Sequence, residues 1–334
     1  MKKFTVSAIA AVGAAGLLLT GCSGGSLSGE ESGGESGGAS SDLTPVTVGL
    51  LQIAPSSVVQ LGIDEGVFEE HGLDVDVQIG QGGAALLPAV QNGDIQFAVG
   101  NPQSVLTAAS QGLDMRIIAN YSRNSETPGD PEENAPSGLV VSDDSGIESY
   151  ADLEGKTVAV NTLQTQGQLT TMEMVERDGG DPDKVEFTEI AFPDQQAQLE
   201  QGNIDAAWIP EPFISGAKAT DGIELLGDPL RAIDGLPTMV TFTSGDFAES
   251  DPETTAAFRD AITEAAELAM SDDEMYRQAV VDFTGMDAAV VENVNLEYIS
   301  GELDPQAIEE LNDLAVRYGM LENPADLDTV ITTD

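Results

Sequence analysis

Residues 88–98 read PAVQNGDIQFA, and residues 197–207 read AQLEQGNIDAA. Each stretch has the pattern of a helix that ends at a glycine, Gly93 or Gly202, and is followed by a polar residue, an isoleucine and a short strand. The strands expected to open the two regions, at Val46 and Thr157, are separated by nearly the same number of residues. Two matching segments in register predict two similar halves.

Within each half, short β-branched runs alternate with helical patterns. The strands expected in the first half are 46–50, 73–79, 95–99 and 116–121, and the helices are 56–68, 80–91 and 102–109. The strands expected in the second half are 157–160, 185–188 and 206–209, and the helices are 168–178, 194–201 and 213–218. This alternation predicts an α/β protein with two doubly wound, largely parallel lobes. We expect a hinge between the lobes, with connections near 121–141 and 236–244.

The remaining part of the chain has mainly helical patterns. Asp251-Pro252 and Asp304-Pro305 each predict an N-cap followed by proline in the first turn. We expect these C-terminal helices to pack mainly on the first lobe. The predicted division is a leader at 1–21, a tether at 22–44, the N-terminal part of the first lobe at 45–138, the second lobe at 139–240, and a return segment with C-terminal helices at 241–334.

The N-terminal residues have the features of a bacterial lipoprotein leader. Two lysines in 1–3 precede an uncharged apolar run at 4–19, which is shorter than the ~20 residues that span a bilayer. The sequence LTGC at 19–22 resembles a lipobox, which implies cleavage before Cys22 and attachment of lipid, including palmitate, to that residue. Cys22 is the only cysteine, so no internal disulfide can form. Residues 23–42 are mostly Gly, Ser and Glu, a composition typical of a flexible tether.

These features predict a protein anchored by lipid to the extracytoplasmic face of a bacterial cell membrane. The charge is strongly acidic, with 12 Lys and Arg against 59 Asp and Glu and a formal net charge of −47. Nucleic acid is therefore excluded as a partner, because phosphate binding needs a basic surface. The acids are spread along the chain, which favours a solvated acidic surface over a dedicated cation site.

Five motifs in order resemble one group of ABC-transporter binding proteins, the nitrate/sulfonate/taurine and thiamine-pyrimidine-precursor group. The motifs are GVF at 66–68 with HGLDV at 71–75, QNGDIQ at 91–96, DLEGKTVAV at 152–160, GNIDAAW at 202–208 and PEPF at 210–213. The resemblance implies the periplasmic-binding-protein type II fold. It also implies a monomer without cofactor that binds one small molecule between two lobes and delivers it to an ABC permease and its ATPase. A nitrogen-bearing or pyrimidine-like ligand and a sulfonate- or nitrate-like ligand both stay open.

Ligands of open parallel sheets bind beyond the carboxyl ends of the strands, at helix N-termini. The candidate ligand-binding residues in such positions are Gln52, Ala54, Pro55, Gly82, Gly83, Asn101, Pro102, Asn161, Thr162, Leu163, Trp208 and Glu211. Ordinary turn and capping chemistry is the alternative for each of them. Trp208, the only tryptophan, could stack on a flat or methylated ligand or belong to the core. Glu211 could accept a ligand amine or cap the helix that follows.

The segments that carry these candidates contain no Lys or Arg, which favours a neutral or nitrogen-bearing ligand over a sulfonate. We expect no catalytic residue and no metal site. His71, the only histidine, lies in an expected surface turn, and no Cys–His or Ser–His pair is expected near the cleft. Fungal relatives of the group make the thiamine pyrimidine from their own histidine, and this chain lacks their cysteine-rich segment. The alternatives are a lipid-anchored surface receptor or adhesion module without transport and, ranked last, a pyrimidine-synthesising enzyme.

Overall fold

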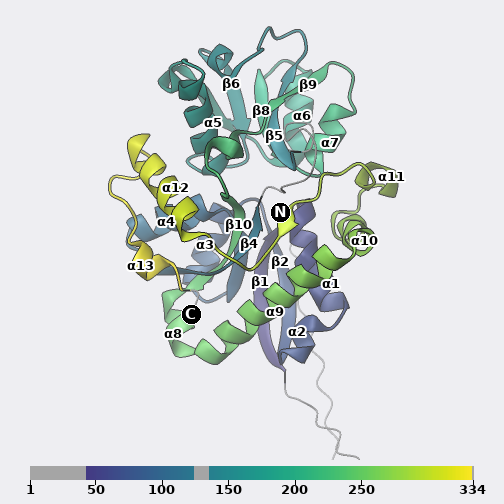
Figure 1. Ribbon diagram of the computed structural model, residues 1–334, viewed down its shortest axis with the longest axis vertical. Helices are drawn as coiled ribbons and strands as arrows, with labels where there is room; N and C mark the ends of the chain where they lie inside the picture. The colour runs from purple at the N-terminus through teal and green to yellow at the C-terminus, as the bar shows by residue number, and fades with distance from the viewer. Residues whose placement is uncertain (1–42, 124–134, 333–334) are drawn as a thin grey trace, which may run out of the picture. The chain divides into compact units, whose positions relative to one another are not determined.

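The structure is a computed structural model that describes residues 43–123 and 135–332. The predicted leader at 1–21, most of the predicted tether at 22–44 and the predicted lipid attachment at Cys22 lie outside the described residues. The described residues form two β-sheets flanked by helices (Figure 1).

The first sheet has the strand order β11-β4-β10-β3-β1-β2. Strands β1, β2 and β3 are parallel, whereas β10 runs antiparallel to both of its neighbours. All eight residues of β10 are buried, as its central place requires, while β2 at the edge alternates between buried or half-buried and exposed residues over most of its length. The bounds are β1 Thr44–Leu51, β2 Leu73–Gly80, β3 Phe97–Gly100, β4 Met115–Arg123, β10 Pro237–Ser244 and β11 Tyr298–Ile299.

The second sheet has the strand order β7-β6-β8-β5-β9. Strands β6, β7 and β8 are parallel, and β5 runs antiparallel to β8 and β9. The bounds are β5 Ser137–Ser142, β6 Thr157–Val160, β7 Glu186–Glu189, β8 Ala206–Pro210 and β9 Ile223–Gly227.

Both sheets follow one plan. In each sheet three parallel strands lie side by side, in the order β2-β1-β3 in the first sheet and β7-β6-β8 in the second. Next to the third of them lies an antiparallel strand that the chain forms as it enters from the other half. That strand is β10 in the first sheet and β5 in the second. The expectation of largely parallel sheets is therefore corrected: the segments expected as connections, 121–141 and 236–244, contain the last three residues of β4, most of β5 and all of β10. Nearly all residues of β5 and all residues of β10 are buried, so these two strands complete the sheets.

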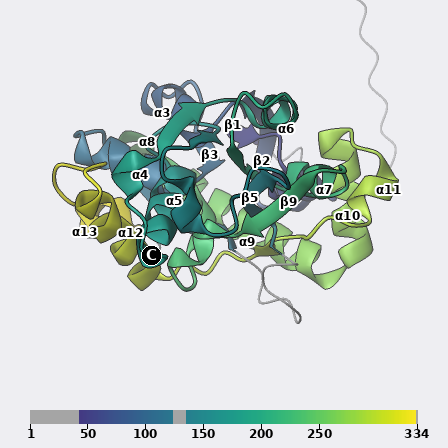
Figure 2. The ribbon, with the colours of Figure 1, turned by 90° about the horizontal axis from the view of Figure 1, so that it is seen from above.

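Helices cover both faces of each sheet. Figure 1 shows α3 and α4 on one side of the first sheet and α1 and α10 on the other, and Figures 1 and 2 show α5 opposite α6 and α7 around the second sheet. The helices are α1 Ser57–Asp64, α2 Val67–Glu70, α3 Gly83–Gln91, α4 Pro102–Ser110, α5 Gln166–Arg177, α6 Phe192–Glu200, α7 Phe213–Lys218, α8 Gly245–Ser250, α9 Pro252–Ser271, α10 Asp273–Thr284, α11 Ala288–Val291, α12 Pro305–Arg317 and α13 Leu327–Val330.

The predicted N-caps of the C-terminal helices are confirmed. The Asp251 side chain accepts from Thr254 N, and that of Asp304 accepts from Gln306 N, before α9 and α12 respectively. Helices α9 and α10 pack on α1 of the first-sheet half. Helix α12 packs on α4 and also reaches the second-sheet half, where Arg317 donates to Glu173 of α5 at 3.1 Å.

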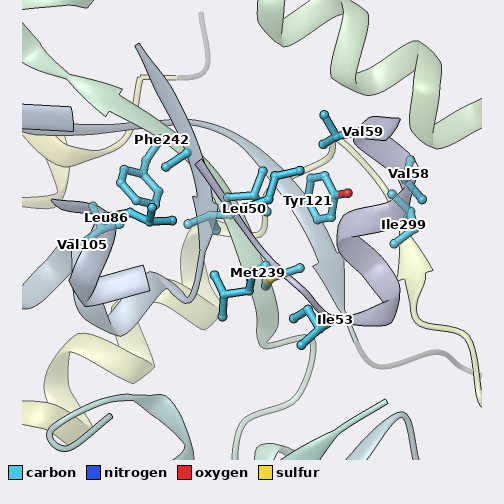
Figure 3. Close-up of a cluster of buried hydrophobic side chains, with 14 of the residues drawn as sticks. Leu50, Ile53, Val58, Val59, Leu86, Val105, Tyr121, Met239, Phe242 and Ile299 are labelled. Atoms are coloured by element: carbon cyan, nitrogen blue, oxygen red, sulfur yellow. The ribbon is translucent and has the colours of Figure 1, made fainter. Parts of the chain in front are cut away.

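The core of the first-sheet half shows how the sheet is enclosed. Figure 3 shows Leu50 of β1 and Met239 of β10 in the middle, with Leu86 on one side and Val58 on the other. These four side chains are buried. Burying apolar surface at about 25 cal/mol per Å² is the main stabilising contribution to such a layer. The core therefore holds the carboxyl ends of the strands in fixed positions.

Candidate functional site

Residues from both sheets line one hollow, which we call the inter-sheet hollow. The space inside it is about 490 Å³ when the open mouth is included. A larger outer hollow of about 760 Å³ adjoins it and shares Leu51, Ile53 and Phe192. The inter-sheet hollow is lined by Leu51, Ile53, Asn101, Ser137, Asn161, Thr165, Gln166, Gly167, Phe192, Trp208, Pro210, Leu230, Thr238, Met239 and Glu297.

Three predicted residues, Asn101, Asn161 and Trp208, come together in this hollow. Asn101 and Asn161 directly follow β3 and β6, and Trp208 lies within β8, two residues before its end at Pro210. Because the parallel strands of both sheets point their carboxyl ends toward the space between the sheets, side chains at these positions converge. The sequence expectation that they share one crevice agrees with the structure.

Asn101 is the N-cap of α4. Its Oδ1 accepts from Ser104 N at 2.9 Å and from Ser104 Oγ at 3.2 Å. These bonds orient the side chain and satisfy one of the unpaired N–H groups of the helix start. The amide nitrogen of Asn101 takes no part in them and is a donor for the hollow.

The N-terminus of α5 meets the hollow through Thr165, Gln166 and Gly167. Thr165 is the N-cap residue, but its hydroxyl donates to Thr162 O at 2.8 Å and no side chain caps the helix. The first N–H groups of this 12-residue helix are therefore free to donate hydrogen bonds. They also lie at the positive end of the helix dipole. They suit an oxygen-rich or anionic group.

Trp208 lies half-buried against the first turn of α5. A Cβ at Gly167 would stand 2.5 Å from Trp208 Cε3, so only glycine allows the indole ring to lie there. The ring centroid of Phe192 is 5.8 Å away. Trp208 Nε1 is buried and has no hydrogen-bond partner among the described residues. Trp208 therefore combines the two roles weighed from the sequence, because it packs on the core and lines the hollow.

Gly82 lies where the first-sheet half packs closely against a loop of the second-sheet half. It is the N-cap of α3 with extended backbone, and a Cβ there would lie 2.7 Å from Thr162 Oγ1 and 3.0 Å from Asn161 Nδ2. The missing side chain makes room for the loop of the second-sheet half. Gly83 is the first residue of α3.

The other predicted residues lie near the hollow without lining it. Gln52 is exposed and lines the outer hollow. Ala54 and Pro55 are buried: Ala54 N donates to Glu211 O at 3.1 Å, and Pro55 O accepts from Tyr121 Oη at 2.7 Å.

Three more predicted residues belong to helix starts and loops. Pro102 is buried as the first residue of α4, and Thr162 is half-buried. The Leu163 side chain is 41% exposed, while its backbone N–H donates to Glu189 Oε2 at 3.1 Å.

Glu211 fits the capping alternative. It is buried and accepts from Ser215 N at 3.2 Å, from Ser215 Oγ at 2.7 Å and from Asn295 N at 2.9 Å. Burial raises the pKa of Glu211 to about 7. Its carboxylate thus holds the first turn of α7 to the C-terminal segment, and it lines neither the inter-sheet nor the outer hollow.

Sequence reasoning missed Glu297, Gln166 and Thr238, which line the hollow. Gln166 stands three residues after Leu163, the last predicted residue of that loop, so extending the prediction into the helix would have included it. Thr238 was assigned to a connection, and Glu297 comes from a stretch without a local pattern. The Thr238 hydroxyl donates to Glu297 Oε2 at 2.5 Å. Nothing local in the sequence indicates this pair.

The charge of the hollow is low. Among the described residues that line the inter-sheet and outer hollows there is no Lys, Arg or His, and Glu297 is the single acid.

Over residues 43–123 and 135–332, no group of three or more His, Cys, Asp or Glu could hold a metal ion. In the same ranges, every helix is too short or too polar to cross a bilayer.

Comparison with known proteins places the chain in a family. The family model described as NMT1/THI5 like matches residues 57–276, more than half of the chain. The taurine-binding periplasmic protein of Escherichia coli (strain K12) is 29% identical over 61% of this chain, and the match spans 59% of that relative.

Solved structures of similar proteins show the fold. The alkanesulfonate-binding protein SsuA from Xanthomonas axonopodis pv. citri, bound to MOPS, superposes with a TM-score of 0.73 at 16% identity, covering 88% of this chain and 99% of that one. The periplasmic nitrate-binding protein NrtA from Synechocystis PCC 6803 gives a TM-score of 0.71 at 12% identity, covering 87% and 86%. The chain has the periplasmic-binding-protein type II fold and belongs to the NMT1/THI5-like family.

Proposed function

We propose that this protein is the solute-binding component of an ABC importer. It captures a small metabolite in the inter-sheet hollow, as a monomer without cofactor, and delivers it to a permease driven by a separate ATPase. The observation that carries this proposal is the convergence of Asn101, Asn161 and Trp208 in one hollow. The relatives named for taurine, alkanesulfonate and nitrate binding support the same class of function.

Binding is coupled to closure of two lobes in this proposal. A ligand that contacts both Asn101 of the first-sheet half and Trp208 of the second makes more contacts in the closed form than in the open form. It therefore binds the closed form more tightly and shifts the equilibrium toward closure. The chain enters the second sheet at the start of β5 and returns to the first sheet at the start of β10, and these two points serve as the hinge. The boundaries proposed at 138/139 and 240/241 fall inside these two strands.

The lining of the hollow limits the ligand. Donors come from the start of α5, from Trp208 Nε1 and from the amides of Asn101 and Asn161. These groups suit sulfonate- or nitrate-like oxygens through hydrogen bonds and a helix dipole. A full anion would be held without a lysine or arginine from the described lining residues. A nitrogen-bearing ligand and a simple anion are therefore both compatible with the lining.

Anchoring at Cys22 on the extracytoplasmic face completes the proposal. It rests on the lipobox-like LTGC at 19–22. Growth with radiolabelled palmitate should label the wild-type chain, whereas Cys22→Ser should be unlabelled and released from the membrane. Labelling of the serine variant would contradict attachment at Cys22.

The solute-binding role is tested by native mass spectrometry of the freshly purified protein, followed by uptake measurements. We expect a small molecule bound in a 1:1 complex that is lost on unfolding. Cells that lack this chain should lose high-affinity uptake of that compound, and wild-type protein should restore the uptake. Unchanged uptake, together with stable binding to another protein, would favour the surface-receptor alternative.

A further inference from the structure

Glu297 is the single acid among the described lining residues of the inter-sheet hollow, and none of them is a cation. The residue is 4% exposed. Burial and the acids Asp228 and Glu211 raise its pKa to about 7, against hydrogen bonds from Ser122 and Thr238. A buried carboxylate is costly unless a positive group or several donors accompany it. Because Glu297 lines the wall of the open hollow, a group of opposite charge can approach it from that side.

Gln166 provides a second acceptor in the same hollow. It is 2% exposed, and its Nε2 donates to Pro237 O at 2.9 Å, which fixes the orientation of the amide. Its Oε1 is buried and has no partner within the described parts of the chain. Buried polar atoms are rarely left unsatisfied, so this oxygen points to an absent donor.

The two acceptors are anchored to neighbouring residues of one strand. Gln166 is tied to Pro237 and Glu297 to Thr238, and these are consecutive residues at the start of β10. Trp208, Phe192 and Met239 supply aromatic and apolar surface around the same hollow. Acceptors combined with aromatic faces are the environment that an ammonium group favours.

We propose that Glu297 and Gln166 receive an ammonium group of the ligand, so that the transported solute is a small amine or a zwitterion and not a simple anion. This inference rests on the proposed solute-binding function. In a zwitterion, the anionic end would face the uncapped start of α5, where the donors lie. Glu297 is then the residue that distinguishes an ammonium compound from its uncharged or purely anionic analogue.

The test uses isothermal titration calorimetry of the lipid-free mature chain with two matched pairs of probes. Taurine is compared with ethanesulfonate, which lacks the ammonium group. Choline is compared with 3,3-dimethyl-1-butanol, its uncharged carbon analogue. We expect at least one ammonium compound to bind at least tenfold more tightly than its counterpart.

Glu297→Gln should reduce that ratio at least tenfold, because it removes the charge while keeping the shape. Glu292→Gln is the matched control, since Glu292 is exposed on the same segment, and it should leave the ratio unchanged. Gln166→Met removes the second acceptor and should weaken the ammonium compound selectively. This variant also keeps the proposal testable if Glu297→Gln does not fold.

Ethanesulfonate binding as tightly as taurine, with no selective effect of Glu297→Gln or Gln166→Met, would overturn the ammonium proposal and leave the solute-binding proposal standing. Absence of binding by both ammonium compounds would also overturn it. The solute-binding proposal is then judged separately, by whether the purified protein carries a different small molecule in native mass spectrometry.

Discussion

Gly82 of α3 and Thr162 of the loop before α5 meet across the two sheets so closely that a Cβ on Gly82 would lie 2.7 Å from Thr162 Oγ1. Asn161 Nδ2 would be 3.0 Å from the same added atom. A methyl group at this point must push the two halves apart or displace two side chains of the site. The two halves can therefore close around the hollow only because residue 82 has no side chain.

Gly82→Ala is expected to weaken ligand binding by about tenfold, which corresponds to ~1.4 kcal/mol, because closure is obstructed. The ligand-free protein should keep its melting temperature. Gly216→Ala is the control, since a Cβ there meets nothing nearer than 3.8 Å. Adding Thr162→Ala to Gly82→Ala should restore part of the affinity. Equal affinity of Gly82→Ala and wild type in calorimetry would count against closure at this contact.

Asn101 is expected to serve both the helix and the ligand. Asn101→Ser keeps a good N-cap, so the free energy of unfolding should stay within about 0.5 kcal/mol of wild type. It removes the amide that faces the hollow, so affinity should fall severalfold. Asn101→Ala should lose affinity and also about 1 kcal/mol of stability. If Asn101→Ser bound ligand like wild type in calorimetry, Asn101 would be a cap alone.

Glu211 is expected to be structural. Glu211→Ala leaves Ser215 N and Asn295 N without their acceptor and removes one of the two acceptors of Ser215 Oγ, so it should lower the free energy of unfolding by roughly 2 kcal/mol or more. Affinity measured on the folded fraction should change little. Glu224→Ala, at an exposed residue of β9, is the control for removal of an acid. A larger loss of affinity than of stability would place Glu211 in the ligand site after all.

Stability is expected to fall as the pH rises from about 5 to 8. The pKa of Glu211 and that of Glu297 are both raised to about 7, so between the ordinary value of 4.5 and about 7 the folded state binds more protons than the unfolded state. The free energy of unfolding then decreases with rising pH, by about 3 kcal/mol per group.

Urea unfolding from pH 5 to 8 measures this slope, and Glu297→Gln should make it shallower. The lowered pKa values of the exposed acids Asp152, Glu154 and Glu176 act below about pH 4.5, outside this range. A wild-type stability that is flat or rises over the range would contradict the assignment.

The parts of the site that follow a strand directly were predictable from sequence. Asn101 and Asn161 directly follow strands that the sequence pattern predicts, and Trp208 lies within another, so the rule for open α/β sheets brings them together. The repeat of the helix, glycine and strand pattern likewise indicated two sheets of one plan.

What could not be predicted depends on contacts between distant segments. β5 and β10 pair with strands that are distant in the sequence, and no local pattern indicates those partners, so their antiparallel places in the sheets were missed. Glu297 reaches the hollow through a bond to Thr238, and neither residue lies in a motif. Glu211 does follow a strand, but its acceptors are used by Ser215 and Asn295, which only the folded chain brings near.

The fluorescence of Trp208 tests the central claim most directly, because it is the only tryptophan in the chain and lines the hollow. A titration with the compound that co-purifies, and with taurine, ethanesulfonate, nitrate and choline, should give a saturable 1:1 change in Trp208 emission for every compound that calorimetry shows to bind. A compound that binds with 1:1 stoichiometry and leaves this emission unchanged would show that the ligand site lies elsewhere.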